Sequence, residues 1–297
     1  MLELIASDMD GTLITGDLHI TEENRQALLR TYALGIPFVA CTGRNFREAQ
    51  FILAEAGIHC PVIGLNGAVL FDRDGTVEHQ IALSDEQALA LMDYCQKHQL
   101  YLEAMTAKNV YSPSRALRIE MMAGMIMMRS DATYAEAIER AKNSNEVKSI
   151  AYLDDLSTLI TEQHQSILKL SVTDARGPEL LTPLAKQFEE TFGPLNVTSS
   201  IPYNLEISAE EANKGAAIKR YCALHGYHLE NVMTIGDNLN DIAMLDVAGY
   251  GFAMENALPP VKEAADYVTL SNNDSGVAQA IYQALKLSGT EDAEPLL

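Results

Sequence analysis

Short apolar runs alternate with segments of helical length over the first 65 residues, and this alternation restricts the fold more than any other feature. Residues 2–7, 37–42 and 61–65 are predicted strands. The two segments between them, 21–34 and 47–56, are predicted helices, each followed at once by a glycine that ends it. Strands and helices at this spacing form a parallel sheet covered on both faces, so we expect a doubly wound α/β core.

The pattern changes in the middle of the chain. Two apolar stretches flank Arg73-Asp74-Gly75, which indicates a hairpin. Ser84-Asp85-Glu86-Gln87 has the sequence of a capping box and begins a helix that is predicted to reach about residue 97. Further strands and helices follow without the regular alternation of the first 65 residues. This stretch is predicted to be a domain inserted into the α/β core.

The alternation resumes at about Tyr203. We therefore predict a Rossmann-like core made of residues 1–82 and 203–297, with an α/β cap domain at residues 83–202. The last ten residues, 288–297, are acidic and contain glycine and proline, and we expect them to form a frayed tail.

Composition excludes several classes of partner. The formal net charge is −20, which opposes binding to nucleic acid and to an anionic membrane surface. No stretch approaches the roughly 18 apolar residues of a membrane span. The four cysteines are scattered without a C-x-x-C pair, which favours free, buried thiols in a reducing compartment. We expect a cytoplasmic monomer or homodimer.

Two carboxylates end the first predicted strand. Asp8 and Asp10 are one residue apart, so on an extended tip both side chains point toward the same place. Gly11 allows the chain to turn beside them. In an open parallel sheet, functional groups gather at the carboxyl ends of the strands. The alternative for an isolated D-x-D-G is an ordinary surface turn.

Three further segments place polar residues after a predicted strand or at a helix start. They are Thr42-Gly43-Arg44, Lys214-Gly215 and Gly236-Asp237-Asn238-Leu239-Asn240-Asp241. Each alone is compatible with a turn or a helix cap. Together at one edge of a sheet they would form an oxygen-rich site beside an ammonium group, which suits Mg²⁺ and a phosphate. A carboxylate nucleophile in such a site indicates phosphoryl transfer through an aspartyl phosphate.

Each residue type suits one part of this chemistry. Asp8 would attack phosphorus, and Asp10 would give a proton to the leaving oxygen and later accept one from water. The Thr42 hydroxyl and the Gly43 amide would hold phosphate oxygens, as groups at helix N-termini commonly do. Lys214 would place a positive charge on the phosphate and on Asp8. The remaining candidates follow the strand at 232–236: Asp237 as a metal ligand, and Asn240 and Asp241 as groups that bind phosphate or orient the site.

These four segments resemble the four motifs of the haloacid dehalogenase-like hydrolase superfamily, in the same order along the chain. Asn66-Gly67-Ala68 and the position of the inserted domain resemble the Cof-type phosphatase subfamily. The resemblance implies a Mg²⁺-dependent phosphatase with a Rossmann-like core and a cap. It also implies that Asp8 is both nucleophile and metal ligand, that Asp10 binds the metal through its backbone carbonyl, and that Asp237 is the third ligand. The residues implied to hold the phosphate are Thr42, Gly43, Lys214 and Asn240.

Several alternatives remain open. A phosphomutase would use the same residues and return the phosphoryl group to a sugar, and a regulator would bind a phosphorylated metabolite without turnover. The expected substrate is a small phosphorylated metabolite, with sugar phosphates ahead of nucleotide-like and vitamin phosphates. Asn66 either faces the substrate or forms a routine turn, and Arg44 either reaches the leaving group or ties the core to the cap.

Overall fold

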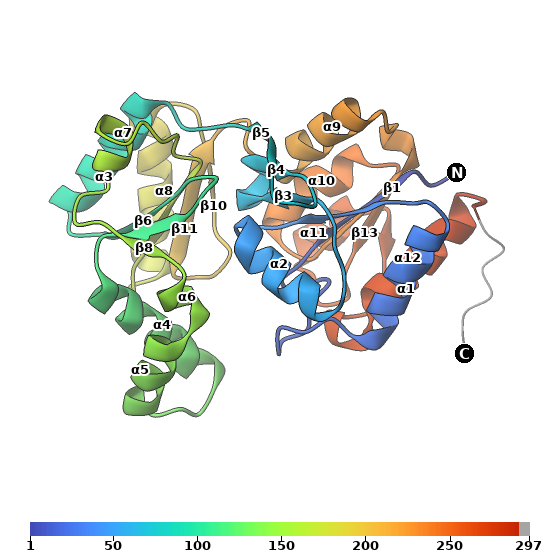
Figure 1. Ribbon diagram of the computed structural model, residues 1–297, viewed down its shortest axis with the longest axis horizontal. Coiled ribbons are helices and arrows are strands. Elements are labelled where there is room, and N and C mark those ends of the chain that lie inside the picture. Colours follow the sequence, from blue (N-terminus) through green and yellow to red (C-terminus); the bar gives the residue numbers. More distant parts are fainter. Residues whose placement is uncertain (291–297) are drawn as a thin grey trace. The chain divides into compact units, whose positions relative to one another are not determined.

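The computed structural model describes residues 1–290, which divide into two compact units (Figure 1). Of the described residues, one unit comprises 1–81 and 211–290, and the other comprises 82–210. The frayed tail predicted at 288–297 lies mostly outside the described residues. None of the described helices is long and apolar enough to cross a membrane. The four cysteines are free and buried, as predicted.

The first unit is built on an eight-stranded sheet in the order β14-β13-β12-β1-β2-β3-β4-β5. The strands from β14 to β3 are parallel, and the β4–β5 hairpin adds an antiparallel edge. The first strand of the chain therefore lies in the middle of the sheet, as a doubly wound fold requires. The strands are β1 (Leu4–Asp8), β2 (Phe38–Cys41), β3 (Val62–Gly64), β4 (Val69–Phe71), β5 (Val77–Gln80), β12 (Val232–Gly236), β13 (Tyr250–Ala253) and β14 (Tyr267–Val268).

Helices cover this sheet. Alternate residues of β1, Leu4 and Ala6, belong to a buried cluster with Ile218 and Tyr221 of α9 and Met244 of α10. Figure 1 shows α1 beside α12. The helices of the unit are α1 (Glu22–Ala33), α2 (Phe46–Glu55), α9 (Lys214–His225), α10 (Ile242–Val247), α11 (Pro259–Ala264) and α12 (Gly276–Leu287), and the short 3₁₀ turns are η1 (Leu65–Gly67), η2 (Leu229–Asn231), η3 (Leu239–Asp241) and η4 (Asn272–Asp274). The doubly wound α/β core predicted from the sequence is confirmed.

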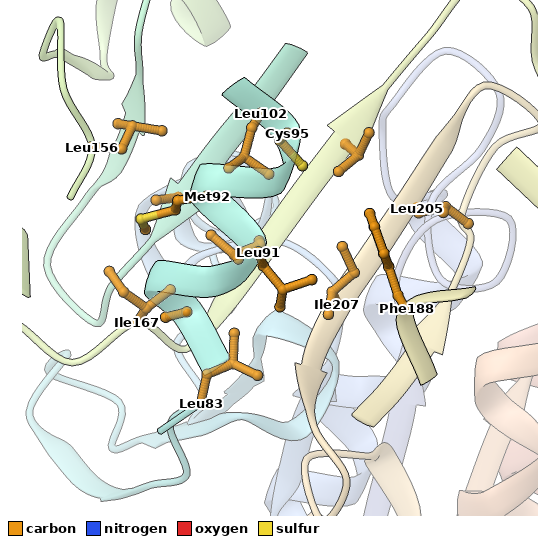
Figure 2. Packing of buried hydrophobic residues seen from close by; sticks show 14 of the residues in the cluster. Leu83, Leu91, Met92, Cys95, Leu102, Leu156, Ile167, Phe188, Leu205 and Ile207 are labelled. Atoms are coloured by element: carbon orange, nitrogen blue, oxygen red, sulfur yellow. The ribbon is translucent and has the colours of Figure 1, made fainter. Parts of the chain in front are cut away.

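The second unit has a six-stranded sheet in the order β10-β11-β9-β6-β7-β8. Its core lies between this sheet and α3, where Leu91 and Met92 pack toward Leu102 of β6 and Ile207 of β11 (Figure 2). Its strands are β6 (Tyr101–Met105), β7 (Val110–Ser112), β8 (Ala151–Tyr152), β9 (Lys169–Thr173), β10 (Leu195–Thr198) and β11 (Asn204–Ala209), and its helices are α3 (Asp85–Lys97), α4 (Arg115–Arg129), α5 (Tyr134–Asn143), α6 (Asn145–Lys148), α7 (Thr158–Thr161) and α8 (Pro178–Phe192). Its own sheet and core make it a separate α/β domain inserted into the first unit.

One predicted boundary is wrong. The sequence placed the return to the core at residue 203, whereas the second unit continues to residue 210. The reason is β11, in which Glu206 pairs with Ser171 of β9 on one side and with Thr198 of β10 on the other. β11 alternates polar and apolar residues, and this pattern taken alone does not show which sheet the strand joins, so the sequence reasoning assigned it to the wrong unit. The first boundary, predicted after residue 82, lies after residue 81.

Candidate active site

The predicted site residues lie around the carboxyl ends of neighbouring strands of the first unit. β1 pairs in parallel with β2 on one side and with β12 on the other. Asp8 is the last residue of β1, Thr42 follows β2, and Asp237 follows β12. Because parallel strands end at the same edge of a sheet, three segments far apart in sequence bring their polar residues together.

Lys214 lies at the centre of this edge. It is the first residue of α9, which Asn213 caps by accepting a hydrogen bond from the amide of Ala216. The Lys214 Nζ lies 2.5 Å from Asp8 Oδ1 and 2.6 Å from Asp241 Oδ1. The Lys214 side chain is fully buried, and so is that of Asp241, while 8% of the Asp8 side chain is exposed. One buried ammonium group thus bridges two carboxylates from separate elements.

Asp241 is held on both of its oxygens. Its Oδ2 accepts hydrogen bonds from the backbone N–H groups of Asp237 and Asn238, each at 3.0 Å, while Oδ1 faces Lys214. Gly236 leaves room for this arrangement, because a Cβ there would lie 2.5 Å from the Asp241 side chain. Asp241 therefore orients Lys214 and the loop that follows β12.

Asp237 is fixed by the segment that follows β1. The Thr12 hydroxyl donates to Asp237 Oδ1 at 2.9 Å. Gly11 lies beside the same carboxylate in a left-handed conformation (φ +79°), and a Cβ at this position would come within 2.5 Å of Asp237 Oδ2. Thr12 was missed by the sequence reasoning. Its position directly after Asp8-Met9-Asp10-Gly11 was the signal that it belongs to the site.

The carboxylates of this cluster outnumber its ammonium group, so the cluster suits a bound cation. Asp8, Asp237 and Asp241 offer oxygens that all lie within 4.8 Å of one another. Burial, more than the repulsion among the carboxylates, raises the pKa of Asp8 well above its ordinary value and that of Asp237 to about 6. Burial alone would lower the pKa of Lys214, but the charges of Asp241 and Asp8 outweigh it and raise that pKa. One ammonium does not neutralise three carboxylates, and clustered carboxylate oxygens are ligands that Mg²⁺ accepts.

Asp10 is oriented differently from Asp8. Its carboxylate accepts two hydrogen bonds from the Arg44 guanidinium, Nε at 2.7 Å and Nη2 at 2.6 Å. Such a bidentate pair fixes the plane of both groups. About half of the Asp10 side chain is exposed, so the pair lies at the open side of the cluster. The sequence predicted both residues for the site but not their contact with each other.

The remaining candidates surround the same strand ends. Thr42 accepts a hydrogen bond on its hydroxyl from the amide of Arg44 at 3.1 Å, and its carbonyl accepts one from the amide of Asn66 at 3.0 Å. Asn66 is buried in a left-handed conformation (φ 60°), and its side-chain oxygen accepts a hydrogen bond from the Asn240 amide at 3.2 Å. The following helix α2 begins after its cap, Asn45, so Thr42 and Gly43 lie in the loop before the helix and not at its first turn.

Comparison with known proteins shows the same architecture. A family model described as haloacid dehalogenase-like hydrolase matches residues 5–281. Phosphatase YwpJ of Bacillus subtilis (strain 168) is 31% identical over 288 residues, which cover 96% of this chain and all of that protein. The 5-amino-6-(5-phospho-D-ribitylamino)uracil phosphatase YwtE of the same organism is 29% identical over 96% of this chain and 98% of its own length. A solved haloacid dehalogenase-like hydrolase from B. subtilis superposes with a TM-score of 0.81 at 30% identity, over 94% of this chain and 99% of that one.

Proposed function

Because the chain belongs to the haloacid dehalogenase-like hydrolases, we propose that its acidic cluster is the active site of a Mg²⁺-dependent phosphatase. The observation that carries this proposal is the buried Lys214 Nζ between Asp8 Oδ1 and Asp241 Oδ1. A site that only binds phosphate does not need a buried carboxylate at its centre, since the carboxylate and the phosphate repel each other. A site in which a carboxylate attacks phosphorus does need one, together with a positive charge that reduces this repulsion.

The residues divide the work of phosphoryl transfer. Lys214 binds Oδ1 of Asp8, so Oδ2 is the oxygen that would attack phosphorus and form the aspartyl phosphate. To act as the acid, Asp10 would first release Arg44 and take up a proton, which it would then give to the leaving oxygen as the bond from phosphorus to that oxygen breaks. Asp10 would then take a proton from the water that hydrolyses the aspartyl phosphate and frees Asp8. Asp8, Asp237 and the backbone carbonyl of Asp10 are the proposed Mg²⁺ ligands, and the bound ion would reduce the repulsion between Asp8 and the phosphate.

The phosphate would be held from several directions. Lys214 offers a positive charge, and Thr42, Gly43 and Asn240 offer hydrogen-bond donors. The contact between Asn66 and Asn240 supports this assignment, because a side-chain amide whose NH₂ group is bound to Asn66 has a defined orientation. In this proposal Asn66 orients Asn240, and Asp241 orients Lys214.

We further propose that the substrate is a small phosphorylated metabolite. The relative YwtE is named for a phosphorylated ribityl compound, and the expectation from sequence favours a sugar phosphate. Both descriptions share a phosphomonoester on a polyhydroxylated carbon chain. We place the enzyme in the cytoplasm, in keeping with the free cysteines and with a substrate of this kind.

The test is phosphate release from p-nitrophenyl phosphate and from a panel of sugar, nucleotide and vitamin phosphates, with Mg²⁺ and with a chelator. We expect turnover with Mg²⁺ and its loss in Asp8→Asn. The matched control is Asp246→Asn, an exposed aspartate on α10 whose replacement should leave turnover unchanged. Undiminished turnover in Asp8→Asn would contradict the proposal. Transfer of the phosphoryl group to a second sugar would indicate the mutase, and binding without turnover across the panel would indicate the regulator.

A further inference from the structure

The segment that carries Asp10 leaves the sheet directly after Asp8. It turns back on itself, with the amides of Thr12 and Ile14 donating to the Met9 carbonyl at 3.2 and 2.9 Å. Three of its carbonyls also accept hydrogen bonds from asparagine side chains. Asn256 Nδ2 donates to Gly11 at 2.8 Å, Asn24 Nδ2 to Leu13 at 3.4 Å, and Asn272 Nδ2 to Ile14 at 2.9 Å.

Backbone N–H groups fix the orientation of the side-chain amides of Asn256 and Asn24. The backbone N–H of Asn272 donates to Asn256 Oδ1 at 3.0 Å, and the backbone N–H of Ala278 donates to Asn24 Oδ1 at 2.8 Å. When the oxygen of a side-chain amide accepts a backbone hydrogen bond, its NH₂ group must point the other way. In Asn256 and Asn24 that direction is toward the segment after β1.

The three asparagines come from separate parts of the first unit. Asn24 is in α1, Asn256 follows β13, and Asn272 begins η4. Asn24 is fully buried and Asn272 is 8% exposed, so both belong to the packed interior. The segment after β1 is thus tied to the body of the unit at three of its carbonyls, and Asn256 binds the carbonyl of the residue next to Asp10.

We propose that these three asparagines, which we call the asparagine clamp, act as positioning residues for Asp10. The inference rests on the proposed function, in which Asp10 transfers the proton. Arg44 holds the carboxylate of Asp10, while the clamp sets the backbone from which that carboxylate projects. A displacement of about 1 Å in a group that transfers a proton costs up to about 100-fold in rate. Asn256 has the largest effect on Asp10, because its contact is one residue away.

The variant that tests this is Asn256→Asp. It keeps the size of the side chain and an oxygen for the Asn272 amide, but it replaces the donor to the Gly11 carbonyl with a second acceptor. Because Asn256 is exposed, the change does not disturb the interior. The matched control is Asn273→Asp, which adds the same charge close by. Toward the described residues, the Asn273 side chain serves as an acceptor for the amide of Gly16 at 3.3 Å, and an aspartate keeps that acceptor.

The readout is kcat/KM for p-nitrophenyl phosphate and for a sugar phosphate that the wild type hydrolyses. Nitrophenolate leaves without a proton, whereas a sugar alkoxide needs one, so only the second substrate depends on Asp10 in the first step. We expect Asn256→Asp to lower kcat/KM for the sugar phosphate about 10- to 100-fold and that for the aryl phosphate less than about threefold. We also expect a burst of nitrophenol, since hydrolysis of the aspartyl phosphate, which needs Asp10 as base, becomes the slow step.

The two substrates separate positioning from general damage. An equal fall in kcat/KM for both substrates, or no fall for either, would overturn the inference. Asn256→Ala is the second variant, because it removes the donor without adding a charge. It should also lower kcat/KM more for the sugar phosphate than for the aryl phosphate, to a smaller extent than Asn256→Asp. Absence of turnover by the wild type would refute the proposed function and this inference with it.

Discussion

Lys214→Met tests whether the buried ammonium group supports the fold as well as the chemistry. Methionine has nearly the length of lysine and no charge, so the variant fills the same space and leaves the carboxylates of Asp8 and Asp241 facing each other. Both are buried, and Lys214 is the cation that bridges them. Removing one partner of a buried ion pair costs about 3–5 kcal/mol, because the remaining charge loses its counter-charge.

This cost sets the expected size of the effect. For a unit of this size each kcal/mol shifts the midpoint of thermal unfolding by roughly 2–4 °C, so we expect a fall of about 6–20 °C at pH 7. The deficit should shrink toward pH 5. Burial raises the pKa of Asp8 and the charge of Lys214 lowers it, so removing Lys214 raises this pKa further. A carboxyl whose pKa is raised in the folded state stabilises that state at low pH and loses this contribution as the pH rises, so the variant should gain more stability than the wild type as the pH falls.

The assay is thermal unfolding of the metal-free protein at pH 5 and pH 7, followed by circular dichroism. Lys219→Met is the matched control, because Lys219 is an exposed lysine on the same helix α9. The double variant Lys214→Met/Asp241→Asn replaces the carboxylate of Asp241 with a neutral amide. This removes its repulsion with Asp8, so part of the lost stability should return. A Lys214→Met protein within about 1 kcal/mol of the wild type, the range of an exposed pair, would refute the reasoning.

Three further predictions concern other parts of the molecule. Because the pKa of Asp237 is raised to about 6, the metal-free protein should lose stability as the pH rises from 5 to 7. Mg²⁺ should raise the thermal midpoint more at pH 7 than at pH 5, and unfolding scans with and without the ion measure this. Gly67→Ala should cost about 1–3 kcal/mol in urea unfolding and lower turnover, because φ is +98° and a Cβ there would overlap the backbone before α9; Gly35→Ala, with φ +76° and open space around it, should lose less stability and no turnover. In the second unit, Lys169→Met removes the buried partner of Glu206 at 2.9 Å and should lower the free energy of unfolding by about 3 kcal/mol, while Lys169→Met/Glu206→Gln should recover part of that loss.

Much of the first unit could be predicted because its signals are local. Runs of apolar residues and glycine stops located β1 to β3 and the helices between them, and the predicted capping box at Ser84 is present at the start of α3. Parallel strands that end at one edge also brought Asp8, Thr42 and Asp237 together, as the sequence predicted. These features depend on residues close together in the chain and on one rule of sheet topology.

The boundary of the inserted domain shows where such reasoning fails. β11 alternates polar and apolar residues, and its pairing with β9 and β10 is what assigns it to the second unit. Strand pairing joins residues that are distant in sequence, and its choice of partner is decided by the packing of the whole unit.

The sequence by itself determined the family, the α/β core and the residue types at the site, because the motifs combine a strand end with a fixed set of polar residues. The tertiary structure alone decided which of those residues touch. Lys214 bridges Asp8 and Asp241, Arg44 binds Asp10, and Asn256 holds the Gly11 carbonyl. Such contacts depend on the direction of each side chain to within about 1 Å. Strand register and helix packing fix that direction, and the spacing of residues along the chain does not encode it.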